Sequence, residues 1–356
     1  FFCIALVTIF AIGQRREVRR FEFSQKLDRL AEVVERSRAP LTMPGTAAEL
    51  TTKARLNLEN SIAEFGDGVE DWRDWSPSSA TSLDAREAFE STVGHAFYLL
   101  ANNPVRSEGL DDQVAIRFNR LAEDAFSAGQ IPRAVYLQRQ WLGGEVSDEQ
   151  IQLPETFNAN ALPRDLILEA GEQMRDGDFG GAWHLLSRAE AASPRNFNAR
   201  FLMGNCQQAL GDSSQAILEF TAAAGLWPES PIPYLYRGLA RLERGDAIGA
   251  ESDFGKSLEI DPQSISALLN RAVARIKLRS YQSALSDLDA VIESPDPPPR
   301  TLFLRSKVRK LLGDVAGADE DRTRGLSLEP VDEDGRIARA LAYLPHDPQR
   351  CKTELE

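Results

Sequence analysis

Residues 176–182 read DGDFGGA and place Asp178, Phe179 and Gly180 in succession. An aspartate in such a triplet can hold a magnesium ion that bridges the phosphates during phosphoryl transfer. The same letters can also form a turn between two helices, in which a glycine adopts a positive φ. The rest of the sequence decides between a phosphotransfer site and a turn.

The companions that phosphoryl transfer requires do not accompany the triplet. No glycine-rich loop, no lysine-bearing strand and no His-Arg-Asp catalytic loop precedes it. A Gly-x-Ser-x-Gly elbow and a His-Glu-x-x-His helix are also missing. The cysteines and histidines lie too far apart for metal-ligand spacing: Cys3, Cys206, Cys351, His95, His184 and His346. The sequence therefore predicts no catalytic residues, no metal site and no cofactor.

Length and charge restrict the classes of partner. The chain has 356 residues, of which 42% are hydrophobic, enough for one elongated domain or two compact ones. The 54 acidic residues outnumber the 41 Lys and Arg and give a net charge of -13. Such a charge repels phosphate backbones, so we expect a protein or peptide partner and no nucleic acid.

The first residues carry a membrane signal. Residues 1–13 read FFCIALVTIFAIG and are followed at once by QRREVRR. Thirteen apolar or small residues are fewer than the about 20 of a full span, so we interpret 1–13 as the end of a truncated transmembrane helix with a basic stop. By the positive-inside tendency, the arginines predict that the remainder lies in the cytoplasm, as part of a single-pass protein.

Residues 14–82 are expected to form a juxtamembrane helical stalk and a loop. Apolar residues recur with helical spacing from Arg15 to Arg38, the prolines of APLTMPGT break the helix, and a second helix follows from Ala47 to Phe65. The loop after it contains Trp72 and Trp75, which either anchor a partner or pack over a neighbouring helix. No stretch shows the alternation of a strand, so the protein is predicted to be all-α.

A period of 34 residues governs the second half of the chain. Pro194, Pro228, Pro262 and Pro330 lie at multiples of 34, and Asp296 fills the missing place. Five blocks follow from this spacing: 163–196, 197–230, 231–264, 265–298 and 299–332.

Four positions in the blocks explain how two helices can pack closely. Small residues stand at positions eight and twenty, larger ones such as Phe254 and Leu288 at position twenty-four, and glycine at position fifteen in four blocks. This pattern resembles the tetratricopeptide repeat family, most closely in YLYRGLARLERGDAIGAESDFGKSLEIDP. The resemblance implies an α-solenoid of helix-turn-helix repeats over 163–332. Gly177, Asp178 and Phe179 occupy positions fifteen to seventeen, so DGDFGGA is predicted to be a turn.

The flanking segments fit the pattern less well. Residues 83–162 contain degenerate helical repeats and a linker, with one copy beginning at Ala115. Residues 333–356 begin a sixth helix in register and then depart from the pattern, as a partial or capping repeat.

The resemblance also implies a binding groove. In this family, first-helix positions two, five, nine, twelve and thirteen line the inner face of the superhelix. The corresponding residues are Phe201, Asn205, Gln208, Leu235, Leu239, Leu242, Leu269, Val273, Ile276, Lys277, Phe303, Lys307 and Lys310. Such a surface suits an extended or helical peptide with apolar anchors and an acidic flank, although Leu239 and Ile276 could instead pack against the next repeat.

Three blocks share a charged pattern. Position seven carries arginine and position twenty-three carries aspartate, which predicts ion pairs within or between blocks. The residues are Arg237, Arg271 and Arg305 with Asp253, Asp287 and Asp321. Paired charges can be accommodated near a core, whereas an unpaired one is costly. The alternative is a solvated ladder of charges.

These observations favour a membrane-tethered scaffold that binds protein or peptide partners without chemistry of its own. A second hypothesis is that the chain is the sensory or docking region of a larger enzyme, because FLMGNCQQALGDSSQAILEFTAAAGLWPESPIPYLYRGLARLERGD resembles the C-terminal half of bacterial proteins in which a serine/threonine kinase domain precedes a membrane helix and repeats. A third is self-assembly through the repeats.

Overall fold

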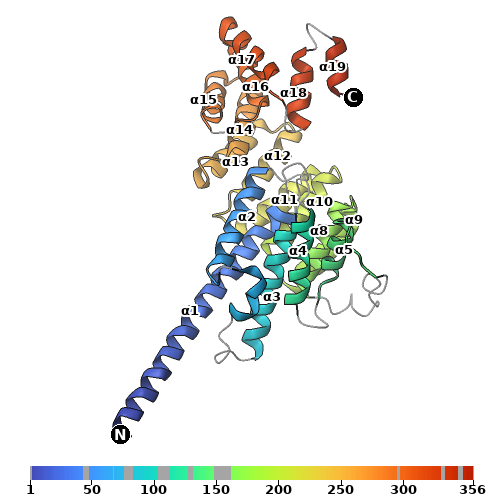
Figure 1. Cartoon of the computed structure of the whole chain (residues 1–356). Coiled ribbons are helices and arrows are strands. Elements are labelled where there is room, and N and C mark those ends of the chain that lie inside the picture. Colours follow the sequence, from blue (N-terminus) through green and yellow to red (C-terminus); the bar gives the residue numbers. More distant parts are fainter. Residues whose placement is uncertain are drawn as a thin grey trace. The chain divides into compact units, whose positions relative to one another are not determined.

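The computed structural model consists of helices and connecting turns (Figure 1). The structure describes residues 2–42, 48–66, 68–75, 83–102, 112–126, 131–147, 162–294, 297–329, 333–343 and 348–355. Within these ranges there is no strand, as the sequence predicted. Pro330, Asp296, Gly129 and most of the expected linker before Pro163 lie outside the described residues.

The chain divides into two compact units. Unit 1 spans Phe1–Leu210 and unit 2 spans Gly211–Glu356. Unit 1 contains α1 (Phe2–Thr42), α2 (Ala48–Ala63), the 3-10 helix η1 (Val69–Trp75), α3 (Leu83–Ala101), α4 (Asp112–Ala125), α5 (Arg133–Trp141), α8 (Pro163–Arg175), α9 (Phe179–Ala192) and α10 (Phe197–Ala209). Unit 2 contains α11 (Ser213–Leu226), α12 (Ile232–Glu243), α13 (Ala247–Ile260), α14 (Ile265–Lys277), α15 (Tyr281–Ile292), α16 (Arg300–Leu311), α17 (Val315–Ser327), α18 (Glu333–Tyr343) and α19 (Pro348–Leu355).

The 34-residue blocks correspond to pairs of helices. In unit 2, each helix from α11 to α17 packs against the next one along the chain, so hairpins follow one another in a row. The position-fifteen glycines between paired helices have φ of 80° to 89°, a conformation that glycine adopts without a Cβ penalty. The fourth block places Arg279 there, at φ 62°.

The inside of each hairpin shows matched side-chain sizes at positions eight and twenty-four. Gly238 lies against Phe254, and a Cβ built on Gly238 would come within 2.6 Å of the Phe254 ring. The next block pairs Ala272 with Leu288, and all four residues are buried. A larger side chain on the second helix thus accompanies a smaller one on the first.

Block 299–332 departs from this scheme with polar residues. Ser306 at position eight donates a hydrogen bond to the Ala318 carbonyl oxygen at 2.6 Å. Arg322 at position twenty-four reaches the Ala342 carbonyl oxygen near the end of α18 at 3.0 Å. Ser306 thus bonds a backbone oxygen of the paired helix, and Arg322 bonds a backbone oxygen near the end of α18. Both hydrogen bonds stand where the other blocks have apolar contacts.

Of the expected membrane segment, residues 1–13, the described residues 2–13 form the beginning of α1, whose first turns project beyond the other helices of its unit (Figure 1). Among the described residues, no helix combines the length and the apolar character that crossing a bilayer demands. Helix α1 continues through Pro40 to Thr42, whereas a break at the prolines was expected. Pro40 stands in the last turn, where it removes one helical hydrogen bond, and Leu41 beyond it is fully buried.

The described residues of the expected stalk and loop, 14–42, 48–66 and 68–75, belong to unit 1, where α1 and α2 pack against each other and against α3. Helix α1 packs against α2 and α3, and Leu30, Val34 and Leu58 belong to the same buried cluster as residues of α3 and α4. The charged background of α1 suggested an isolated helix, but its apolar stripe is covered by the neighbouring helices. Trp72 and Trp75 belong to this core as well, and each stacks beside an aromatic ring.

Candidate functional site

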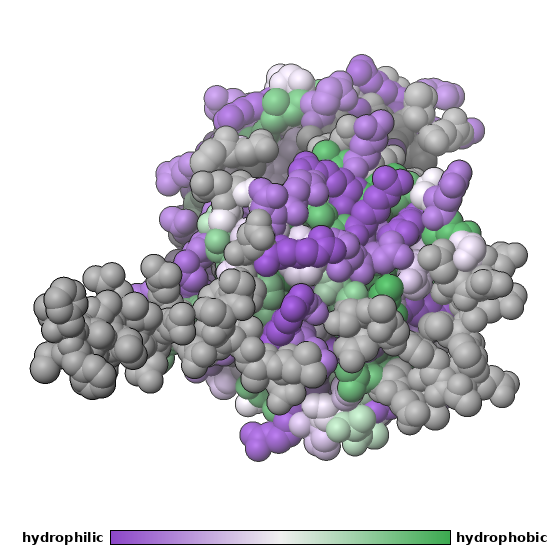
Figure 2. Space-filling view, turned by 60° about the horizontal axis from the view of Figure 1, so that its bottom comes forward, coloured by the Kyte–Doolittle hydropathy of each residue, from purple (hydrophilic) through white to green (hydrophobic). Residues whose placement is uncertain are grey.

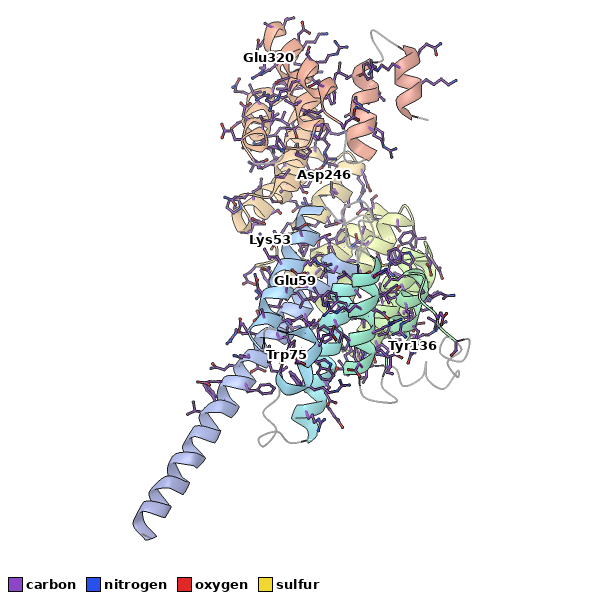
Figure 3. The ribbon with its side chains drawn as sticks, viewed as in Figure 1. Lys53, Glu59, Trp75, Tyr136, Asp246 and Glu320 are labelled. Atoms are coloured by element: carbon purple, nitrogen blue, oxygen red, sulfur yellow. The ribbon has the colours of Figure 1, made fainter. Side chains whose placement is uncertain are left out.

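The DGDFGGA segment is a capped turn. Asp178 is the N-cap of α9, and its carboxylate accepts a hydrogen bond from the Gly181 amide at 2.8 Å. Asp212, Asp246 (labelled in Figure 3) and Asp314 cap α11, α13 and α17 in the same way. The aspartate serves to satisfy free amides at a helix start. In the described part of the chain, His, Cys, Asp and Glu form no group of three that could hold a metal ion.

The charged pattern of unit 2 forms ion pairs inside each hairpin. Arg237 is bidentate to Asp253, with 2.6 Å from Nη2 to Oδ1 and 2.9 Å from Nε to Oδ2. Arg241, one turn later, donates to the same carboxylate at 2.8 Å. The Asp253 side chain is only 3% exposed. Two guanidinium groups therefore neutralise one buried carboxylate.

The next two blocks repeat this arrangement. Arg271 and Arg275 hold Asp287 at 2.7 Å each, and Arg305 and Arg309 hold Asp321 at 2.6 and 3.1 Å. Hydrogen bonding to Asp321 raises the pKa of Arg305 further above its usual value. We call these nine residues the Arg-Asp ladder: Arg237, Arg241, Asp253, Arg271, Arg275, Asp287, Arg305, Arg309 and Asp321.

The ladder also connects successive blocks. Arg305 Nη1 donates to Asp289 of the preceding block at 2.8 Å, and Arg237 Nη1 donates to Thr221 at 3.2 Å. Arg275 reaches back to Glu251 at 2.8 Å. Both kinds of pair are therefore present, within blocks and between them, and they link hairpins that otherwise meet through apolar contacts.

One acceptor is missing from the ladder. Thr221 and Asp289 stand 16 residues before their arginines, and the equivalent residue for Arg271 is Gly255. A Cβ added at Gly255 would meet no atom within 4 Å. Position 255 in the middle of α13 therefore has room for a carboxylate beside Arg271.

Changing Gly255 to Asp is expected to raise the stability of unit 2 by about 0.5–1.5 kcal/mol, through better helix propensity and a new pair with Arg271. Thermal unfolding followed by circular dichroism would measure the change. Gly255→Asn, whose helix propensity is close to that of Asp, separates the helix contribution from the ion pair. If the asparagine variant equals the aspartate variant at low salt, the added pair contributes nothing.

The residues of the expected groove differ widely in exposure. Phe201, Leu235 and Leu269 are at most 4% exposed, so they belong to the cores of their units. Phe303 is half-buried, with its ring against Gly325 of the paired helix, and Ile276 packs on the buried cluster around Leu288. Among the others, Asn205, Gln208, Leu239, Leu242 and Val273 are half-buried, while Lys277, Lys307 and Lys310 are exposed.

A smaller set of residues stays accessible on the first helices of unit 2. Its members lie on α14, α16 and α18, of which α16 and α18 contact each other. We call this set the basic face: Lys277, Lys307, Lys310, Leu311, Ile337 and Leu341. Leu311, Ile337 and Leu341 are 49%, 40% and 56% exposed. Sequence reasoning missed these three, although Ile337 and Leu341 hold positions five and nine of the sixth block.

The three lysines of the basic face are free of intramolecular neutralisation. Within the described ranges, no hydrogen bond or ion pair joins Lys277, Lys307 or Lys310 to another group. By contrast, the arginines of the ladder all hold carboxylates. The basic face is thus a local positive surface on a chain of net charge -13.

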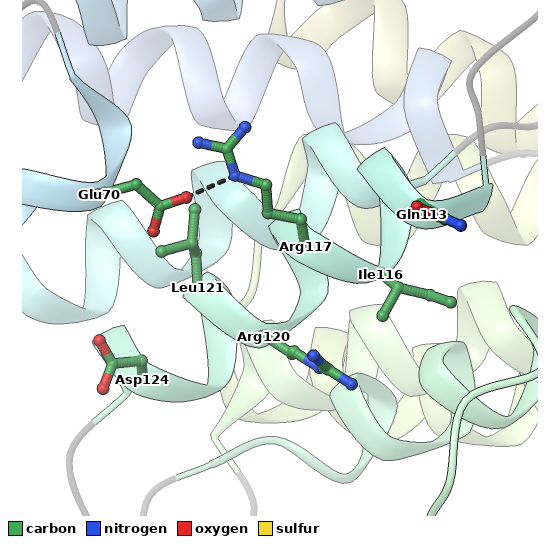
Figure 4. Close-up of a pocket in the computed structure, with 7 residues that line it drawn as sticks. All are labelled: Glu70, Gln113, Ile116, Arg117, Arg120, Leu121 and Asp124. Carbon is green, nitrogen blue, oxygen red and sulfur yellow. Dashed lines mark hydrogen bonds and ion pairs between the residues drawn. The ribbon is translucent and has the colours of Figure 1, made fainter.

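Unit 1 contains a depression of about 560 Å³ along α4 (Figure 4). Its lining residues are Glu70, Gln113, Ile116, Arg117, Arg120, Leu121 and Asp124. Arg117 points toward Glu70 and pairs with it, while Asp124 accepts from Arg73 and from the Trp72 indole. Among the described lining residues there is no nucleophile paired with a base.

Unit 1 also buries a polar cluster between α3 and α8. Tyr98 donates to Glu172, which also accepts from Arg175. Burial raises the pKa values of both Tyr98 and Glu172 above their ordinary values. His95 Nε2 lies 3.8 Å from Asp165 Oδ1; burial lowers the pKa of His95 and raises the pKa of Asp165 to about 6. These groups connect α3 and α8 inside the core of unit 1.

On the face shown in Figure 2, hydrophilic residues predominate among those coloured, and apolar residues form separate small spots. A surface of this kind gives no sign of a broad apolar interface there. The basic face is the better candidate because its apolar and charged side chains share three first helices in one repeat register.

Comparisons with known proteins give a partial relative and distant structures. No family model matches the chain. Protein FlbA of Caulobacter vibrioides is 34% identical over 109 residues, which are 30% of this chain and 18% of FlbA. Pseudomonas aeruginosa PilF has a TM-score of 0.48 at 17% identity, covering 71% of this chain and 99% of PilF. A tetratricopeptide repeat protein from Parabacteroides merdae has a TM-score of 0.47 at 18% identity, covering 68% and 84%. Both TM-scores are below 0.5, so these structures do not support an assignment of the fold. The description of the fold depends on the helix pairs of this chain.

Proposed function

We propose that this protein is an interaction scaffold that binds an acidic, partly apolar segment of another protein on the basic face. The observation that carries the proposal is the combination of three lysines without internal partners and three exposed apolar side chains on neighbouring helices. An acidic partner gains charge-assisted contacts there, and its apolar residues cover Leu311, Ile337 and Leu341.

The rest of the molecule supports binding better than catalysis. The buried carboxylate of Asp253 is engaged by arginines, and the exposed carboxylate of Asp178 caps a helix. General acid-base or nucleophilic chemistry needs such groups directed into a cleft that admits substrate. Repeated hairpins that present a rigid row of side chains are suited to recognition instead.

The full chain carrying Lys307→Glu and Lys310→Glu is expected to lose at least about tenfold in affinity for its partner, because two attractive charges become repulsive. Partners are captured by a photo-crosslinking amino acid placed at Leu341, and their affinity is then measured with the purified proteins. Lys256→Glu, on the second helix α13 of the same unit, is the matched control. Retained affinity in the double variant contradicts the proposal.

A membrane attachment through residues 1–13 is part of the same proposal. It is supported by the apolar run followed at once by QRREVRR and by helix α1, which continues from both into the packed helices of unit 1. The alternative, a docking region of a membrane-anchored serine/threonine kinase, has the sequence resemblance as its support. In both cases the basic face would bring a partner to the tether.

A further inference from the structure

First helices of the repeats are buried to different extents in the two units. Helix α8 of unit 1 buries eight residues, including Glu169 and Glu172. The equivalent helices α14 and α16 of unit 2 bury four and three. All three helices are the first helix of their block. The greater burial of α8 therefore requires additional helices packed on it that have no equivalent on α14 and α16.

Helices from the N-terminal part of the same chain cover α8. Helix α1 contacts both α8 and α10. Helix α3 contributes Tyr98, which donates to Glu172, and Asn102, which accepts from Arg175. Leu168 of α8 belongs to the buried cluster formed by α1, α3 and α4.

The covered side is the one that the repeat pattern assigns to a ligand. Asn198, at position two of α10, donates to the Glu35 carboxylate of α1 at 2.8 Å and to the Glu35 carbonyl oxygen at 3.3 Å. Ile167 and Met174, at positions five and twelve of α8, are 1% and 2% exposed. A helix of the chain itself therefore lies where the resemblance places a bound peptide.

Helix α1 meets this side through the Glu35 carboxylate, and its apolar stripe belongs to the buried cluster that also contains Leu168 of α8. Leu30 and Val34 are buried one turn apart, and Glu35 is the residue that reaches Asn198. This arrangement is an amphipathic helix laid against a helical surface, with an acidic side chain fixing its register. The unit 1 contact thus supplies an internal example of how these first helices accept a ligand.

The basic face offers the same kind of surface without a covering helix. Lys307, Lys310 and Leu311 are spaced as one face of α16, and Ile337 and Leu341 are one turn apart on α18. The exposed side chains of two neighbouring helices can pack against the side-chain ridge of a third helix. The lysines on α16 would attract the acidic side chains of the bound helix and so determine which of its sides faces α16.

An extended peptide would find few partners for its backbone on this face. Position nine carries Leu239, Val273, Lys307 and Leu341 in unit 2, so no side-chain amide stands there. The position-nine amide of unit 1, Asn205, is already used within its own helix, where it donates to the Phe201 carbonyl oxygen at 3.0 Å. A helical ligand needs no such donors because its own backbone is satisfied internally.

We infer that the ligand of the basic face is an amphipathic α-helix with an acidic stripe, seated between α16 and α18. This inference rests on the proposed function and specifies the conformation of the partner segment. Leucine-type side chains on that helix contact Leu311, Ile337 and Leu341, and glutamates on its flank face Lys307 and Lys310.

The test uses the full chain and three fluorescent 18-residue peptides, acetylated and amidated at their ends, in an anisotropy titration. The first combines leucines at helical spacing with glutamates. The second has the same composition with two interior leucines in the D form, which breaks the helix. The third replaces glutamate by lysine. The first is expected to bind at least about tenfold more tightly than either of the others.

The outcomes separate this inference from the proposed function. Equal binding of the first and second peptides overturns the helical ligand and leaves an acidic-segment binder. Failure of both acidic peptides to bind at about 1 mM overturns the proposed function as well. Tight binding of the helical peptide that Lys307→Glu with Lys310→Glu does not weaken, relative to Lys256→Glu, overturns the location.

Discussion

Replacing Asp287 by alanine is expected to lower the free energy of unfolding of unit 2 by about 3–5 kcal/mol, the cost of breaking a buried ion pair from one side. The Asp287 side chain is 4% exposed and accepts from both Arg271 and Arg275. Without it, two guanidinium groups that are 21% and 19% exposed lose the carboxylate they share. Their charges cannot be removed by deprotonation, because arginine stays protonated in proteins.

Urea denaturation followed by circular dichroism would measure the loss, with the transition of unit 2 analysed separately because two units need not unfold together. Asp287→Asn keeps the shape and removes the charge, so it should lose an intermediate amount. Glu320→Ala, at an exposed site on α17 (Figure 3), is the control and should change stability by about 0.5 kcal/mol or less. An unchanged midpoint for Asp287→Ala would mean that the ladder is solvated and weak.

Part of this ladder was predictable from the sequence. Positions seven and twenty-three recur with fixed spacing, and in a helix hairpin they face each other, which predicted the pairing of Arg237 with Asp253. The links between blocks were less accessible. Two of them depend on which residue stands at position twenty-five, and that residue is Thr221, Gly255 or Asp289 without a repeating type, while the third uses Glu251 at position twenty-one.

The packing of the N-terminal helices was not predictable in the same way. In a repeat array each hairpin packs on the next one, so the repeat pattern itself predicts which helices are in contact. Helix α1 is not part of a repeat, and its packing partners cannot be predicted in this way. Its spacing showed an apolar stripe but not the surface that covers it. The contact between Glu35 and Asn198 joins residues 163 positions apart, and no local pattern encodes such a pair.

Exposure within the predicted groove could be inferred only in part. The repeat register placed Leu235, Leu269 and Lys307 on one side of their helices, but how far each is covered depends on the bulk of the neighbouring hairpin. Leu235 and Leu269 are buried whereas Lys307 is exposed. Extending the repeat register into the sixth block would also have placed Ile337 and Leu341 on this side.

Substitutions at Gly238 and Phe254 are expected to have coupled, non-additive effects on stability in a double-mutant cycle. Gly238→Ala should cost about 1–3 kcal/mol, because the new methyl group would lie 2.6 Å from the Phe254 ring in a closely packed interior. Phe254→Leu alone should cost about 1 kcal/mol or more, because it leaves a small cavity beside the glycine. Thermal and urea unfolding of the full chain would measure both.

The double variant should recover stability, since alanine with leucine is the pair that the chain already uses at Ala272 and Leu288 and at Ala170 and Leu186, all fully buried. A favourable coupling of about 0.5–3 kcal/mol is expected between residues in contact. Gly238→Ala combined with Leu258→Ala, a buried site on another turn of α13, should instead be additive. If the effects of Gly238→Ala and Phe254→Leu are additive, the sizes of these two side chains are energetically independent. The matched pairs in neighbouring blocks would then have no common physical cause.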